Sequence, residues 1–302
     1  MKSFTELRNL FGTLCNNSAT DNLTFGDELL NMSIREICTS FDWNFLERNR
    51  TASTVAGTQF YELPGDCEKV NTVTIISSTT QYLAKECPSR EYWDYLNSNT
   101  DVRSVSPEWF FVYNGQLGFY PIPSTAITNG INYRYLRKIK NLSIADYTTG
   151  TVDIITAAGA VTGSSTTWTA PMIGRYLRVT PSNTAAADGD GLWYEIATRT
   201  SNTVIGLTKV YLGTALATGA SAAYAIAEVP ILPEAYHTLP VYKACEIYFS
   251  TRADDLVKAD KFKKMFDEGL YQMRKTHGRK TTNVVVHSTD MPFINPNLSI
   301  RL

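Results

Sequence analysis

The histidines of this chain are the first residues to test for catalysis or metal binding, because imidazole serves as both a general base and a metal ligand. The sequence contains three of them, His237, His277 and His287. None belongs to an H-E-x-x-H pattern, in which two histidines one helical turn apart hold zinc. The chain also lacks the G-x-S-x-G turn of serine hydrolases and the P-loop of nucleotide-binding proteins. These patterns predict no enzyme, no catalytic residue and no cofactor.

The segment Asp-Gly-Asp-Gly at residues 188–191 comes closest to a ligand-binding loop. It lacks the lysine of a phosphate-binding loop, and it also lacks the spacing and the closing glutamate of a calcium-binding EF-hand. Segments that we expect to be strands precede and follow it. A turn between strands is therefore favoured over a metal or phosphate site.

The five cysteines are Cys15, Cys38, Cys67, Cys87 and Cys245. They are odd in number, far apart along the chain and free of any C-x-x-C pair, so the sequence predicts neither a disulfide framework nor a zinc site. The first two and the last lie in helical patterns, where we expect them to be small buried apolar residues.

The charge balance argues against a protein that grips nucleic acid by its phosphates, because such proteins usually carry a basic excess. The net charge is −1, and the clearest basic runs lie at residues 134–140 and 258–264. Acidic residues interleave the second run, as on the solvated face of a helix. Nucleic-acid binding stays open for the first run as the less favoured interpretation. We expect no sequence-specific contact with DNA.

The first residues lack the apolar region of a signal peptide, and no segment approaches the roughly 20 apolar residues that span a membrane. The sequence therefore predicts a protein made and assembled in a cytoplasm, with no membrane partner.

Helical patterns occupy both ends of the chain. Ser3 and Glu6 form a capping-box pattern, and apolar residues then recur at helical spacing up to Leu14. A second helix is expected to end near Asp42-Trp43. Helices return at Leu239-Pro240, with one predicted to about Thr251 and another over residues 253–275. The second of these has an apolar stripe that includes Phe262, Phe266 and Leu270.

Alternating strand patterns lie between these helices. A short amphipathic helix is predicted at residues 91–97. The strongest hairpin signal follows it, where segments 109–113 and 116–120 flank Asn114-Gly115, a pair that favours a type I′ turn.

The composition changes near residue 148, and the next 80 or so residues are rich in Thr, Ala, Gly and Ser without a helical period. The predicted strands lie at residues 151–156, 176–180, 192–197, 203–207 and 222–226. Short strands at this spacing are typical of a small sandwich or barrel. We therefore expect an α+β protein: a helical-bundle core with a β-hairpin and sheet element (residues 1–147 and 229–278), and an inserted small all-β domain, sandwich or barrel (residues 148–228).

The last segment, residues 279–302, shows no helical period and is expected to form an extended C-terminal tail that acts as an assembly arm. Its β-prone start can add as a strand to a sheet edge of a partner, and Pro292 and Pro296 keep the remainder extended. A frayed chain end is the alternative. The residues expected to contact the partner are Thr281, Val284, Val285, Val286, Phe293, Ile294 and Ile300.

Several aromatic and turn patterns resemble those of the head-to-tail adaptor proteins of tailed bacteriophages, which are also called connector or head-completion proteins. The segments that carry this resemblance are 42–46 (Asp-Trp-Asn-Phe-Leu), 61–66 (Tyr-Glu-Leu-Pro-Gly-Asp), 109–121, 231–234, 174–176 and 193–196. They are not catalytic signatures, and they extend over most of the chain before Gly278.

The resemblance implies a structural virion protein in the neck, or head-tail connector, assembled in the host cytoplasm. Such adaptors are expected to form a homo-oligomeric, twelve-subunit ring that binds the portal protein on one side and a downstream tail or tail-nozzle protein on the other. Genomic DNA would pass through this ejection channel without sequence-specific binding. The alternative is a phage tail or receptor-binding protein that binds or degrades glycans, because paired carboxylates distant in sequence and tyrosine-rich strands are compatible with such a surface.

Overall fold

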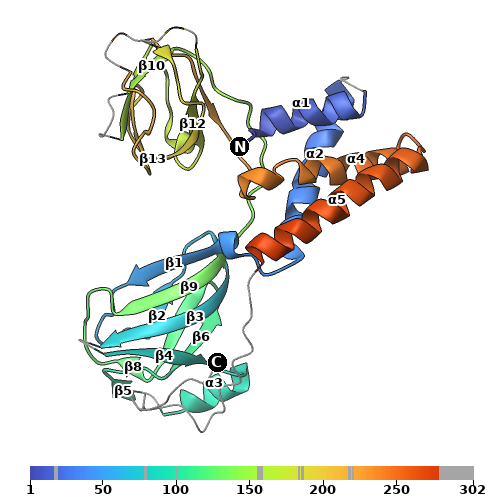
Figure 1. Ribbon diagram of the computed structural model, residues 1–302. Coiled ribbons are helices and arrows are strands. Elements are labelled where there is room, and N and C mark those ends of the chain that lie inside the picture. Colours follow the sequence, from blue (N-terminus) through green and yellow to red (C-terminus); the bar gives the residue numbers. More distant parts are fainter. Residues whose placement is uncertain are drawn as a thin grey trace, which may run out of the picture.

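The computed structural model describes residues 1–16, 20–77, 80–99, 101–154, 159–182, 184, 187–216, 219 and 221–278. In these ranges the chain forms five α-helices, a seven-stranded half-barrel sheet, a six-stranded antiparallel half-barrel and a small two-stranded sheet (Figure 1). The predicted α+β class is therefore confirmed. Buried apolar side chains gather in three clusters, one among the helices and one in each large sheet. The predicted tail, 279–302, lies outside the described residues.

The first helix begins where its capping residues require. The Ser3 hydroxyl accepts the Glu6 backbone N–H at 3.1 Å, and the Glu6 carboxylate accepts the Ser3 N–H at 2.9 Å, so two N-terminal donors are satisfied reciprocally. Pro240 occupies the first turn of its helix, where a missing N–H costs nothing. Four helices pack together, and we call them the helical unit. They are α1 (Phe4–Leu14), α2 (Thr20–Thr39), α4 (Leu239–Thr251) and α5 (Leu256–His277).

Helix α4 lies at the centre of the helical unit, and α1, α2 and α5 all pack on it. Its Val241, Ala244 and Cys245 are fully buried. The stripe predicted on α5 does face inward, since Phe262 and Phe266 are buried. The sequence pattern predicted that this stripe packs against the first two helices or a neighbouring subunit; within the subunit it packs chiefly against α4.

All five cysteines are buried free thiols, which agrees with the prediction for the three in helical patterns. The sulfurs of Cys15, at the end of α1, and Cys245, on α4, lie 3.6 Å apart. Burial raises the pKa of Cys38 to about 12, so this thiol stays protonated and packs as a small apolar residue.

The seven-stranded sheet has the order β1-β9-β3-β4-β6-β7-β2 and is antiparallel except at β4 and β6. Helix α3 (Arg90–Leu96) connects these two strands and so allows them to run parallel. The short strands β5 (Arg103–Ser104) and β8 (Ile122–Pro123) form the two-stranded sheet. The strands of the large sheet are β1 (Glu47–Ala52), β2 (Phe60–Glu62), β3 (Cys67–Ser77), β4 (Thr80–Glu86), β6 (Trp109–Tyr113), β7 (Gln116–Tyr120) and β9 (Ile131–Arg137).

The predicted hairpin is confirmed as β6 and β7. Tyr113 pairs with Gln116, so the loop holds only Asn114 and Gly115. Both have positive φ, 50° and 74°, as a type I′ turn requires.

The six-stranded sheet has the order β10-β11-β14-β13-β12-β15. The predicted strands are present with shifted ends, and the sheet also contains β11, where the sequence analysis predicted no strand. This strand contains a glycine at position 163 because the Cβ of any other residue there would clash with Thr166 and Trp168. The strands are β10 (Thr151–Ile154), β11 (Ala160–Ser164), β12 (Tyr176–Val179), β13 (Trp193–Ser201), β14 (Val204–Leu207) and β15 (Tyr224–Ala227).

The chain enters and leaves this sheet at one place. Tyr147, on the incoming segment, and Ile226, on the outgoing strand, exchange two backbone hydrogen bonds of 2.8 Å each. A short linker could therefore join the two segments with little distortion.

We predict that residues 148–228 form a separable β-domain. Replacing residues 148–225 by a short Gly/Ser linker keeps the pair formed by Tyr147 and Ile226, and it should leave a folded helical protein because the insert has its own apolar core. Far-UV circular dichroism and cooperative thermal unfolding would measure this. A matched deletion that also removes Glu228 should melt at a lower temperature, because the buried Glu228 carboxylate accepts hydrogen bonds from Lys140, Ser143 and Ile144. Loss of soluble helical protein in the first variant would contradict the prediction.

We predict that Phe266→Ala destabilises the protein by about 3–5 kcal/mol, because it removes a buried ring and leaves a cavity. Urea denaturation measures the change in the free energy of unfolding. Val257→Ala, at an 83% exposed position of the same helix, is the control and should change it by less than about 0.5 kcal/mol. A loss below about 1 kcal/mol for Phe266→Ala would show that the stripe carries little of the packing.

Candidate assembly surfaces

The residues predicted to form the assembly arm, Thr281, Val284, Val285, Val286, Phe293, Ile294 and Ile300, lie outside the described residues. The point at which the arm would begin is described. Gly278, directly after α5, forms an antiparallel bridge with Trp43. Trp43 is 1% exposed, and its indole N–H donates to the Ile37 carbonyl at 2.8 Å. The end of α5 is therefore held beside the start of the seven-stranded sheet (Figure 1).

An aromatic surface lies over α3 and the hairpin formed by β6 and β7. We call Tyr92, Tyr95, Trp109 and Tyr113 the α3 aromatic surface. Tyr95 is 72% exposed and Tyr113 is 50% exposed, while the rings of Tyr92 and Trp109 meet edge to face at 5.5 Å. Exposed aromatic rings held by their neighbours are typical of surfaces that bind other proteins.

This surface rests on a rigid base and carries cations at its edge. The buried Trp93 of α3 stacks on Phe111 of β6 with ring centroids 5.4 Å apart, which fixes the helix on the sheet. The Arg90 guanidinium lies 4.2 Å from the Tyr113 ring centroid, and the Lys85 ammonium lies 5.7 Å from that of Trp109. The rings and cations are therefore positioned before any partner binds, which lowers the entropic cost of binding.

The loop at residues 188–191 holds its own backbone together. Asp188 accepts the Ser182 N–H at 2.8 Å, and Asp190 accepts the Leu192 N–H at 3.0 Å and the Tyr194 hydroxyl at 2.5 Å. These bonds occupy the carboxylates, as expected of a turn. In the ranges that the structure describes, no group of three His, Cys, Asp or Glu side chains could hold a metal ion.

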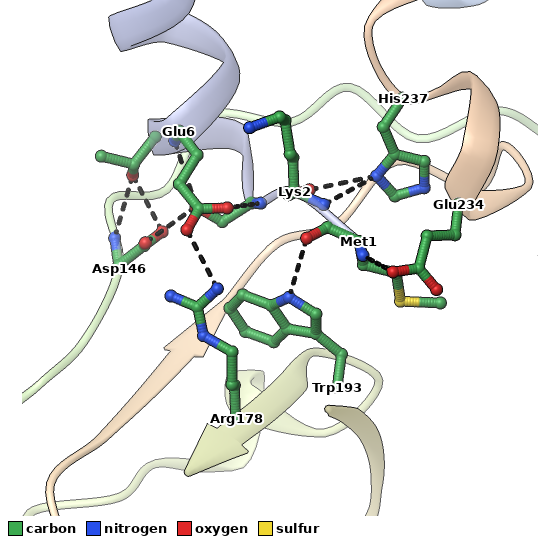
Figure 2. A network of polar contacts seen from close by, with 10 residues as sticks. Met1, Lys2, Glu6, Asp146, Arg178, Trp193, Glu234 and His237 are labelled. Carbon is green, nitrogen blue, oxygen red and sulfur yellow. Dashed lines mark hydrogen bonds and ion pairs between the residues drawn. The ribbon is translucent and has the colours of Figure 1, made fainter. Parts of the chain in front are cut away.

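A polar network around the N-terminal residues joins the helical unit to the six-stranded sheet (Figure 2). Arg178 of β12 forms an ion pair with Glu6 of α1 at 3.0 Å, and its guanidinium lies 4.6 Å from the Trp193 ring centroid. The Trp193 indole donates to the Met1 carbonyl at 3.3 Å, and the Met1 amino group contacts the Glu234 carboxylate. The network therefore fixes the β-sheet against α1.

His237 anchors the same network from below the surface. The ring is 1% exposed; its Nε2–H donates to the Leu232 carbonyl at 2.9 Å, and Nδ1 accepts the Lys2 N–H at 3.0 Å. Both ring nitrogens are therefore satisfied in the neutral form. Burial lowers the pKa of His237 below its usual 6.5, although the neighbouring carbonyls oppose this effect.

Two segments, 138–147 and 228–233, connect the sheets and the helices, and Glu228 holds them together. Its carboxylate is 3% exposed and accepts the Lys140 ammonium at 2.7 Å, the Ser143 N–H at 2.8 Å and the Ile144 N–H at 3.1 Å. Its own carbonyl accepts the Phe4 N–H at 2.8 Å. One residue thus links the exit of the β-sheet, the connecting segment and α1.

The structure separates the two basic runs. The cations of run 258–264 lie on the exposed face of α5, where Lys258 pairs with Asp255 at 3.0 Å, as predicted for a solvated face. In run 134–140, Arg137 and Lys140 line a cavity between the two sheets and the helices. Sequence reasoning did not identify this junction, whose residues are far apart along the chain.

None of the helices within the described ranges combines the length and the apolar character needed to cross a membrane.

The comparison with protein families places this chain among the structural adaptor proteins of phages. The matching family is the SU10 adaptor protein, over residues 2–163, which is 162 of the 302 residues, and the chain belongs to this family. The match runs from α1 through the seven-stranded sheet to β11. No curated protein matches the chain. The family implies a structural, non-enzymatic protein that is located in the virion and binds other virion proteins.

We predict that His237 makes stability depend on pH. Because the folded pKa lies below the unfolded value of 6.5, the unfolded chain binds a proton that the folded chain does not. The contribution of His237 to the free energy of unfolding is complete above pH 6.5, and it is lost as the pH falls through the pKa of the folded state. His237→Gln should therefore flatten the decline in melting temperature between about pH 7 and pH 5. His277→Gln is the control. If the melting temperature fell equally steeply with pH in wild type and in His237→Gln, this role would be refuted.

Proposed function

We propose that this protein is the head-to-tail adaptor subunit of a tailed phage, forming a ring between the portal and the tail through which the genome passes. Membership of the SU10 adaptor family is the single observation that carries this proposal. The ring, its placement and the channel go beyond the family match, and surface features of the chain support them.

Ring formation requires two different faces on each subunit that bind each other head to tail. The α3 aromatic surface supplies one suitable face. Its rings are large, exposed and held in place, so contacts made through them bury area at a low cost in side-chain entropy.

The proposed arm, residues 279–302, would reach the portal or tail neighbour. Its start is held by the bridge between Gly278 and the buried Trp43, so the arm would leave from a fixed position. A segment too short to form a core of its own gains order only when it lies against a partner, so the arm would contribute to assembly and not to folding of the subunit.

Passage of DNA requires a channel that does not hold phosphates tightly. The net charge of −1 is compatible with this requirement, since strong phosphate binding depends on a basic excess. The exposed lysines of α5 are interleaved with Asp260, Asp267 and Glu268, which lowers the attraction of that face for DNA.

We predict that the purified protein forms rings, alone or on the portal of its phage, and that truncation after Gly278 abolishes joining to the portal or tail neighbour. Negative-stain electron microscopy and co-sedimentation measure both. The truncated chain should keep the circular dichroism spectrum and melting temperature of the full chain, because the described cores end before residue 279.

Control experiments test ring formation and the role of the arm separately. A full-length variant with Val257→Ala, an exposed change on α5, should assemble like wild type. A compact trimer in place of rings would contradict the adaptor proposal and favour a receptor-binding tail protein. Infectious particles that assemble normally with the truncated chain would refute the role of the arm.

A further inference from the structure

Arg175 is a buried arginine without a partner. It precedes β12 and is 8% exposed, and its side chain makes no hydrogen bond or ion pair with any residue that the structure describes. Its backbone is fixed on both sides, since its N–H donates to Met172 at 3.1 Å and its carbonyl accepts the Ile196 N–H at 2.8 Å. The Nε of its guanidinium is buried without a hydrogen-bond partner, and burying such a donor without an acceptor is unfavourable.

Arg175 lines a cavity of about 290 Å³ at the junction of the two large sheets and the helices. Arg137, from the end of β9, lines it from the other sheet. The Nη2 of Arg137 donates to the Phe45 carbonyl at 3.0 Å, but its Nε is buried with no partner. Burial and the nearby charge of Arg48 lower the pKa of Arg137. Two arginines from different sheets therefore line one cavity, and the Nε of each is buried without a hydrogen-bond partner.

The charges around the cavity do not balance. Five cations and three carboxylates line it. Arg48 pairs with Asp66 at 3.6 Å, and Lys140 pairs with Glu228 at 2.7 Å.

The cavity cations left after this pairing are Arg137, Lys138 and Arg175. Glu195 is the remaining acid, and it forms no ion pair in the described part of the chain. The excess is positive and lies where water is partly excluded, so it favours an anion.

We propose that this cavity binds a small phosphate-class oxyanion, held by Arg175 and Arg137. A guanidinium offers parallel N–H donors that match the oxygens of phosphate, and such charge-assisted bonds strengthen as solvent is excluded. The ion would link β12 to β9 and so fix the orientation of the six-stranded sheet relative to the seven-stranded one. The same chemistry could come from free phosphate or from a DNA phosphodiester. The burial of Arg175 favours the free ion.

The test uses the full-length protein with inorganic phosphate as the probe. Differential scanning fluorimetry and isothermal titration calorimetry should show saturable stabilisation and binding by phosphate, compared with chloride at equal ionic strength. Arg175→Gln should weaken phosphate binding at least about tenfold, because it removes the fork of donors. It should fold as well as wild type in chloride, since it removes an uncompensated charge. Arg134→Gln, an exposed change on β9, is the matched control and should bind like wild type.

Two further measurements keep the proposal falsifiable. Glu195→Gln should tighten phosphate binding severalfold by removing a competing carboxylate. A duplex oligonucleotide at equal phosphate concentration should stabilise the protein less than the free ion. Equal stabilisation by chloride, unchanged phosphate binding in Arg175→Gln, or stabilisation by the duplex but not by free phosphate would each overturn the proposal.

Discussion

The buried carboxylate of Glu228 joins parts of the molecule that are far apart in sequence. Burial alone would raise its pKa, but the Lys140 ammonium and the N–H groups of Ser143 and Ile144 outweigh this effect and lower it. The carboxylate therefore stays charged and keeps its donors. Glu228 directly follows the last strand of the six-stranded sheet, and its carbonyl accepts the backbone N–H of Phe4 at the start of α1. The placement of this sheet relative to the helices therefore depends on Glu228. The N-terminal network around His237 adds a second connection between the six-stranded sheet and the helices (Figure 2).

Local signals in the sequence predicted the elements whose geometry depends on neighbouring residues. The capping box of Ser3 and Glu6 and the Asn114-Gly115 turn fall in this group, because their hydrogen bonds and φ angles are set within a few residues. Strand β11 was missed because glycine usually marks a turn, whereas Gly163 allows close packing against Thr166 and Trp168 just after the strand. The parallel pairing of β4 with β6 likewise depends on contacts that no short pattern encodes.

The candidate binding surfaces also depend on contacts that short sequence patterns do not encode. The aromatic residues of α3 were visible in the sequence as an amphipathic helix, but their exposure depends on how Trp93 stacks on the sheet. Arg175 and Arg137 belong to segments that the sequence places in different elements, and neither carries a motif. The tertiary fold brings them to one cavity. The residues predicted for the arm remain a prediction, supported by the fixed position of Gly278 from which the arm would start.

The helical unit is built from both ends of the chain, and this has a consequence for biosynthesis. During translation α1 and α2 leave the ribosome early, but α4, on which both pack, begins only at Leu239. At roughly 5–20 residues per second, the 199 residues between Thr39 and Leu239 take about 10–40 s to make. Throughout that interval the apolar faces of Phe11 and Leu30 lack their main partner. Until α4 is made, the nascent chain therefore exposes apolar helix faces that chaperones can bind.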